Sequence, residues 1–156
     1  MRSVNVFYHK LEKDYQKIFK DIIKRIKTQY GWDLSYMKLQ ILDKCVNENN
    51  IIEHNKKSIN CPGSYTTKKI IYIGSLQHIE KVKRHHNIRI NTHKFLKQMI
   101  VHELMHEVYR KNLTPSQKKW YKDMLLQGGF VTPYLEKINN GDEEKFCEYI
   151  AHSLYG

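Results

Sequence analysis

One helical stretch in the second half of the chain constrains the fold and the chemistry more than any other segment. Apolar residues recur over residues 92–108 at three- and four-residue intervals, which predicts an amphipathic helix capped by Thr92. These apolar residues are Phe95, Leu96, Met99, Ile100, Leu104 and Val108. The pentapeptide His102-Glu103-Leu104-Met105-His106 lies in the middle of this helix. Residues four positions apart share one helix face, so both imidazoles can bind the same ion.

The H-E-x-x-H spacing indicates a zinc site. Imidazole is a good zinc ligand, and a catalytic zinc takes three protein ligands and leaves one position for water. Glu103 lies beside the two histidines and can reach a water bound to the ion. We therefore expect about one Zn²⁺ per chain, bound by His102 and His106, with Glu103 as a catalytic residue.

The third ligand is expected in the acidic segment near the carboxyl terminus, where the candidates are Glu144, Glu148 and His152. Glu144 and Glu148 are one helical turn apart, so one can bind the metal while the other orients a ligand histidine. The spacing alone does not choose between them. Acidic residues in the first turn of a helix also have a simpler explanation, since they complement the helix dipole.

Residues 94–156 resemble the carboxy-terminal part of the anthrax lethal factor-like zincins, a family that includes the Pro-Pro endopeptidases. The resemblance rests on the H-E-x-x-H pentapeptide, on Phe130-Val-Thr-Pro-Tyr134 and on Glu144-Lys-Phe-Cys-Glu148-Tyr-Ile-Ala151. It implies a zincin-like fold and a zinc metallopeptidase of the gluzincin type. Cys147 stands where the family usually has alanine, and the interval from Tyr134 to Glu144 is a few residues longer than the family's.

The resemblance also implies roles for individual residues. The two histidines are zinc ligands and Glu103 is the general base, as the motif itself suggests. Glu144 becomes the third ligand and Tyr134 the catalytic tyrosine. Glu148 becomes a carboxylate that does not bind the metal but orients a ligand histidine. Tyr134 has a chemical argument of its own, because a phenolic donor near the metal can stabilise the oxyanion of a tetrahedral intermediate.

The first half of the chain predicts one long helix and a small sheet. Apolar residues at helical spacing predict an amphipathic helix over about residues 9–30, ended by Gly31. Strands are predicted over residues 36–42 and 69–73, the second rich in β-branched residues and closed by Gly74. The segment between these two strands is polar and predicts turns and loop.

Two further helices are predicted after the H-E-x-x-H helix. Thr114 followed by proline predicts a helix start, with the helix running to about Gln127 and ending at Gly128-Gly129. Asp142 can cap a last helix, whose apolar residues are again spaced three or four apart.

These elements predict an α+β fold in which one zincin-like domain spans residues 1–156. A small mixed sheet lies in the sheet-rich half, about residues 32–91, and the catalytic helical half covers about residues 92–156. We expect residues 69–73 to be an edge strand of the sheet and to bind a protein or peptide substrate by strand addition.

The chain is strongly basic, with 27 Lys and Arg against 16 Asp and Glu and a formal charge of +11. Such a charge favours acidic partners or nucleic acid. Residues 81–100 are dense in basic side chains and predict a solvated loop or a patch for acidic ligands. Two alternatives follow: a DNA-associated zinc protease resembling the SprT-like zincins, with His152 as third ligand, or a non-catalytic basic nucleic-acid-binding module of zincin shape.

The preferred interpretation is a zinc-dependent endopeptidase, in which Glu103 takes a proton from metal-activated water and passes it to the leaving amine. The intact Glu103 argues against a non-catalytic module, because a structural metal site has no need of it. The amino terminus has no apolar stretch of signal-peptide length and no segment predicts a membrane span, so a cytoplasmic location is expected. Richness in Lys, Ile and Asn favours an AT-rich genome, such as that of a bacterium or a phage.

Overall fold

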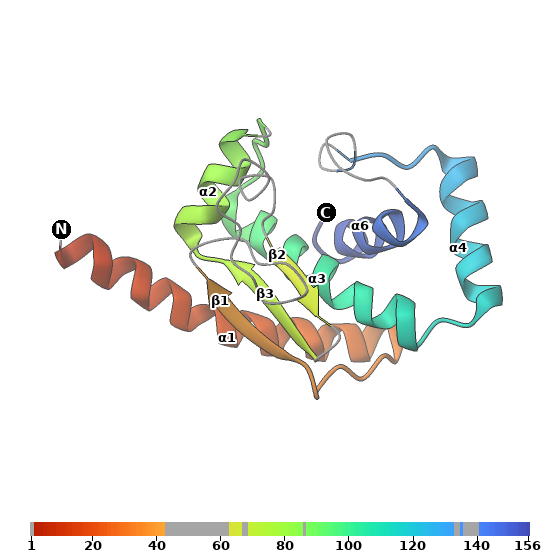
Figure 1. The fold of residues 1–156 in the computed structure, drawn as a ribbon, viewed down its shortest axis with the longest axis horizontal. Helices are drawn as coiled ribbons and strands as arrows, with labels where there is room; N and C mark the ends of the chain where they lie inside the picture. The colour runs from red at the N-terminus through yellow and green to blue at the C-terminus, as the bar shows by residue number, and fades with distance from the viewer. Residues whose placement is uncertain (1, 43–62, 67–68, 86, 133–134, 136–140) are drawn as a thin grey trace.

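The computed structural model describes residues 2–42, 63–66, 69–85, 87–132, 135 and 141–156, which include five helices and three strands (Figure 1). In chain order these are α1 (Arg2–Tyr30), β1 (Lys38–Leu42), β2 (Gly63–Thr66), β3 (Ile70–Gly74), α2 (Leu76–His85), α3 (Thr92–Lys111), α4 (Pro115–Gly128) and α6 (Asp142–Tyr155). A mostly helical chain with one small mixed sheet agrees with the predicted α+β class.

The strands lie in the order β1-β3-β2, which makes β3 the central strand. β1 runs parallel to β3 and β2 runs antiparallel to it, so that Leu39 and Tyr65 both lie opposite Ile71. The prediction that residues 69–73 form an edge strand is therefore wrong. Residues 71–74 are buried, as expected of a strand with neighbours on both sides. The edges of the described sheet are β1 and β2.

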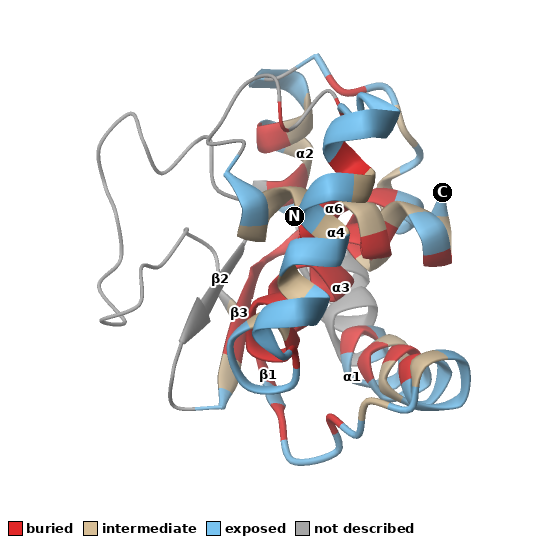
Figure 2. Cartoon of the chain, turned by 90° about the vertical axis from the view of Figure 1, so that its right-hand side faces the viewer, coloured by how far each residue is buried: buried red, intermediate tan, exposed pale blue. Residues whose placement is uncertain are grey.

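α3 is the central helix of the molecule. It contacts β2, β3, α1 and α2, and it packs most extensively against α6. Every residue from Gln98 to Val108 is buried, so the helix is covered all round rather than on one face. Figure 2 shows the buried residues gathered on α3 and the sheet, with exposed residues on the outer faces of α1 and α4. The H-E-x-x-H motif therefore lies in the core.

The start of α3 differs by one residue from the prediction. Asn91 caps the helix, because its side chain accepts hydrogen bonds from the backbone nitrogens of His93 and Lys94 at 2.9 and 3.3 Å. Thr92, the predicted cap, instead donates its hydroxyl proton to Glu80 of α2. That bond joins the middle of α2 to the first turn of α3.

The two carboxy-terminal helices begin and end close to the predicted positions. Thr114 caps α4 in a reciprocal capping box with Gln117, and α4 ends at Gly129, which has the left-handed φ of 60°. α6 begins at Asp142, one residue earlier than a cap at Asp142 implies, because Gly141 occupies the cap position. The prediction of Asp142 as the cap is therefore wrong by one residue.

Two helices in the first half differ from the predictions. α1 is 29 residues long and begins earlier than expected, and it ends at Gly31, whose φ is 79°. α2 was not predicted; part of it lies in the basic segment 81–100, for which the sequence predicts a solvated loop or a patch for acidic ligands. Ile79 and Val82 are fully buried and fix α2 against the core. Among the described helices, none is both long and apolar enough to cross a membrane.

A cluster of aromatic rings holds α6 in place. Phe146 of α6 is fully buried, and its ring centroid lies 4.8 Å from Tyr121 of α4, 5.6 Å from Tyr109 of α3 and 6.2 Å from Trp32. Aromatic pairs at such spacing add to the free energy gained by burial. One side chain therefore joins α3, α4, α6 and the segment after α1.

Replacing Phe146 by alanine should lower the free energy of unfolding by about 3–5 kcal/mol, because it leaves a cavity where three rings meet. Trp120→Ala is the matched control: Trp120 is 59% exposed, and its loss should cost about 0.5 kcal/mol or less. Urea unfolding followed by circular dichroism measures both. Equal losses in the two variants would show that Phe146 does not fix α6.

Candidate active site

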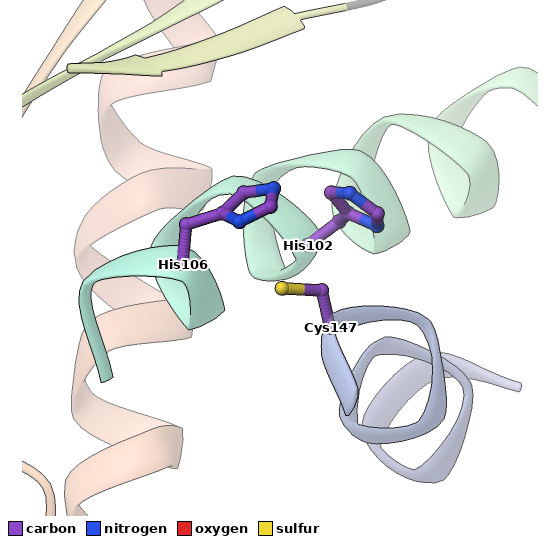
Figure 3. Close-up of side chains that lie close together, drawn as sticks. All are labelled: His102, His106 and Cys147. Carbon is purple, nitrogen blue, oxygen red and sulfur yellow. The ribbon is translucent and has the colours of Figure 1, made fainter. Parts of the chain in front are cut away.

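The packing of α3 against α6 brings the predicted metal ligands together. His102 and His106 lie on α3, and Glu144 and Glu148 lie one turn apart on α6. Figure 3 shows the two imidazoles side by side, with Cys147 of α6 directed toward them. The ring centroids of the histidines are 5.1 Å apart. Residues more than 35 positions apart in sequence thus form one polar cluster inside the core.

His102 lies between two carboxylates. Its Nδ1 is 2.8 Å from Glu148 Oε2, and its Nε2 is 2.9 Å from Glu144 Oε2. His106 is placed in the same way, with Nδ1 2.5 Å from Glu143 Oε2 and Nε2 3.2 Å from Glu144 Oε1. The carboxylate of Glu144 therefore spans the Nε2 atoms of both rings, one oxygen to each.

This arrangement needs positive charge. A neutral imidazole has one N–H, yet both nitrogens of each ring face a carboxylate oxygen, which can only accept. Burial alone would lower the pKa of His102, but hydrogen bonds to Glu144 and Glu148 raise it well above its ordinary value. Burial alone would likewise raise the pKa of Glu144, but the two histidines hold it well below its usual range.

A divalent cation fits the same geometry. A doubly charged ion would supply the charge of two protons, and His102 and His106 would then each keep one Nδ1–H to donate. Two imidazoles and one carboxylate are a donor set that zinc uses in catalytic sites. His102, His106 and Glu144 are therefore residues that could hold Zn²⁺ at this place.

Each histidine has its own supporting carboxylate, which fixes the ring and its tautomer. Glu148 accepts at Oε1 a 2.9 Å hydrogen bond from the hydroxyl of Thr132, which accepts from the backbone nitrogen of Leu135 at 3.1 Å. Glu143 forms an ion pair with Arg110, whose Nη2 lies 3.2 Å from Glu143 Oε2. The supporting role predicted for Glu148 has this geometric basis.

The sequence analysis missed Glu143, Thr132 and Arg110. Glu143 has no metal-site role in the sequence analysis, which offers the helix dipole as the alternative explanation for acidic residues in the first turn, yet it contacts His106 as closely as Glu148 contacts His102. A usable signal was present: two ligand histidines need two supporting carboxylates as well as a third ligand, and the last helix offers three glutamates.

A second buried acid lies next to the motif. Glu107 is fully buried, accepts a 2.5 Å hydrogen bond from the hydroxyl of Tyr36 and pairs with Lys111 Nζ at 3.4 Å. Tyr36 lies just before β1, so this hydrogen bond connects the segment that leads into the sheet with α3, the helix that carries the histidines.

Glu103 is buried beside the two histidines, with its Oε1 4.0 Å from His106 Nε2. Burial raises the pKa of Glu103, and the charges of His102 and His106 oppose the rise. A carboxylate with a raised pKa is better suited to accept and return a proton near neutral pH.

Cys147 offers another donor atom at the same place. It is fully buried, and its Sγ and one nitrogen from each of His102 and His106 all lie within 4.8 Å of one another. Burial raises the pKa of this thiol. Glu144 lies 2.9 and 3.2 Å from the two Nε2 atoms, and the Sγ of Cys147 lies within 4.8 Å of one nitrogen from each ring, so both side chains are candidate third ligands.

The remaining predicted residues take other positions. His152 lies behind Glu148, with Nε2 3.9 Å from Glu148 Oε1, and burial lowers its pKa. This places it next to a supporting carboxylate, whereas Glu144 contacts both Nε2 atoms. Tyr134, the predicted catalytic tyrosine, lies outside the described residues.

No protein-family model, curated protein or solved structure matches the chain. The chemistry of the site therefore has to be argued from its own residues and distances.

The geometry predicts an order of zinc loss among variants of α6. Glu144→Ala should lose the most zinc, because it removes a direct ligand. Glu143→Ala and Glu148→Ala should each weaken zinc affinity about 10–100-fold, as expected for supporting partners. His152→Ala should have little effect. Zinc content after dialysis against a mild chelator gives the order.

Circular dichroism of each variant provides the control for folding. If His152→Ala empties the site while Glu144→Ala keeps its zinc, the third ligand is His152 and the site is of the SprT-like kind.

Proposed function

We propose that this chain is a zinc-dependent endopeptidase of the H-E-x-x-H gluzincin type, with a zincin-like fold. The observation that carries the proposal is the Glu144 carboxylate held between the Nε2 atoms of His102 and His106 at 2.9 and 3.2 Å. The buried carboxylate of Glu103 next to them supports a catalytic role rather than a structural one.

The residues of the chain divide into those that hold the ion and those that hold the ligands. When bound, zinc would act as a Lewis acid toward a peptide carbonyl and lower the pKa of a water. His102 and His106 would bind it through Nε2, and Glu144 through its carboxylate. Glu148 and Glu143 accept the Nδ1 protons and so keep both rings in the tautomer that frees Nε2.

Glu103 is the proposed proton carrier. Its carboxylate takes a proton from the attacking water and later returns it to the nitrogen of the leaving amine, so the side chain ends in its starting state. Burial in a water-poor cluster keeps the proton on this path, since few solvent molecules reach a side chain that is only 9% exposed.

The substrate is proposed to be a protein or peptide in extended conformation. β2 is an edge of the described sheet and contacts α3, the helix that carries the motif. A peptide added along β2 would gain main-chain hydrogen bonds and pass close to α3 (Figure 1). β2 therefore replaces residues 69–73 as the proposed docking strand. The charge of +11 favours acidic substrates, and Tyr134 remains the proposed oxyanion donor.

Glu103→Gln should keep its fold and its zinc but lose about 10²–10⁴-fold in peptide cleavage, because it removes proton transfer and leaves the ligands in place. Cleavage of a peptide library, followed by mass spectrometry, measures the loss. Asp123→Asn makes the same charge change at an exposed residue of α4 and is the matched control. Undiminished cleavage by Glu103→Gln would mean that the motif is not catalytic.

A further inference from the structure

Cys147 occupies an unusual place in the candidate site. It lies on α6 between Glu144 and Glu148, and its side chain is fully buried. Figure 3 shows its sulfur directed toward the imidazoles of His102 and His106. A buried thiol can be a small apolar filler, and Cys147 does belong to the hydrophobic core, but its sulfur also faces the two imidazoles of the candidate metal site.

The distances suit a ligand. The donor atoms around a tetrahedral zinc, with bonds of about 2.0–2.3 Å, lie roughly 3.3–3.6 Å apart. The sulfur and one nitrogen from each histidine already lie within 4.8 Å of one another. Glu144 is one turn before Cys147 on the same helix, so both side chains approach the imidazoles from the same side.

We propose that the Cys147 sulfur is a fourth protein ligand of the ion, beside His102, His106 and Glu144, so that the resting site is closed. The inference rests on the proposed function. As the sulfur binds the ion, the thiol proton is released to solvent; no electron is transferred and no bond other than S–H is broken.

A closed site has a direct consequence for activity. Four protein ligands around zinc leave no position for water, which is typical of structural rather than catalytic sites. The sulfur must therefore leave the ion before a water can enter. Cys147 would therefore keep the proposed protease inactive, and dissociation of its sulfur from the ion would allow activity.

Cobalt substitution tests the inference without relying on catalysis. The full-length chain loaded with Co²⁺ should show a near-ultraviolet thiolate-to-cobalt charge-transfer band. The band should be lost in Cys147→Ala and in the size-matched Cys147→Ser, while both variants keep about one bound ion per chain. Circular dichroism verifies that each variant folds. The double variant Cys45→Ser, Cys61→Ser changes the other two cysteines and should keep the band.

A second comparison separates the sulfur from the carboxylate. Glu144→Ala should keep a weakened site that still shows the band, whereas Glu144→Ala combined with Cys147→Ala should bind no cobalt. The Cys147→Ala variant alone should cleave peptides faster per bound zinc than the unmodified chain.

The outcomes distinguish the two proposals. A wild-type chain that binds cobalt without the charge-transfer band, or a band that survives Cys147→Ala, overturns the sulfur ligand and leaves the proposed protease intact. A wild-type chain that binds neither cobalt nor zinc overturns the metal site itself.

Discussion

The structure depends on one electrostatic constraint: two buried imidazoles face three carboxylates. Both nitrogens of His102 and of His106 lie next to a carboxylate oxygen, and Glu144 serves both rings. Uncompensated carboxylates in a core are costly, so this cluster needs two positive charges in close reach. Two protons or one divalent ion can supply them. An ion would do so while leaving each ring in a single tautomer, which is the arrangement that the proposed zinc site requires.

The rest of the fold keeps the two helices at the distance that the cluster requires. Phe146 joins α6 to α3 and α4 through ring contacts, and the bond from Tyr36 to Glu107 ties α3 to the segment before the sheet. Glu143 and Glu144 lie in the first turn of α6, where the helix dipole also favours negative charge. The two explanations of these glutamates are therefore compatible. The same carboxylates can complement the dipole of α6 and contact the histidines of the proposed metal site.

Sequence reasoning succeeded where the relevant contacts are local. The position of His102 and His106 on one helix face follows from helical periodicity, and Thr114 followed by proline predicts the start of α4 correctly. Sequence reasoning was incomplete where the contacts are between helices. The spacing of Glu144, Glu148 and His152 does not show which of them lies next to the histidines, because that depends on how α6 packs on α3. Sequence reasoning failed where the local signal was weak. β2 is only four residues of polar character, Gly63–Thr66, and without it β3 was taken for an edge strand.

The central claim is that His102 and His106 hold one zinc ion. Elemental analysis of the purified chain, after dialysis to remove loosely bound metal, tests it directly against a His102→Ala, His106→Ala double variant. We predict about one zinc per chain in the unmodified protein and almost none in the double variant, because the remaining carboxylates cannot replace both imidazoles. Equal zinc content in the two proteins would contradict the account.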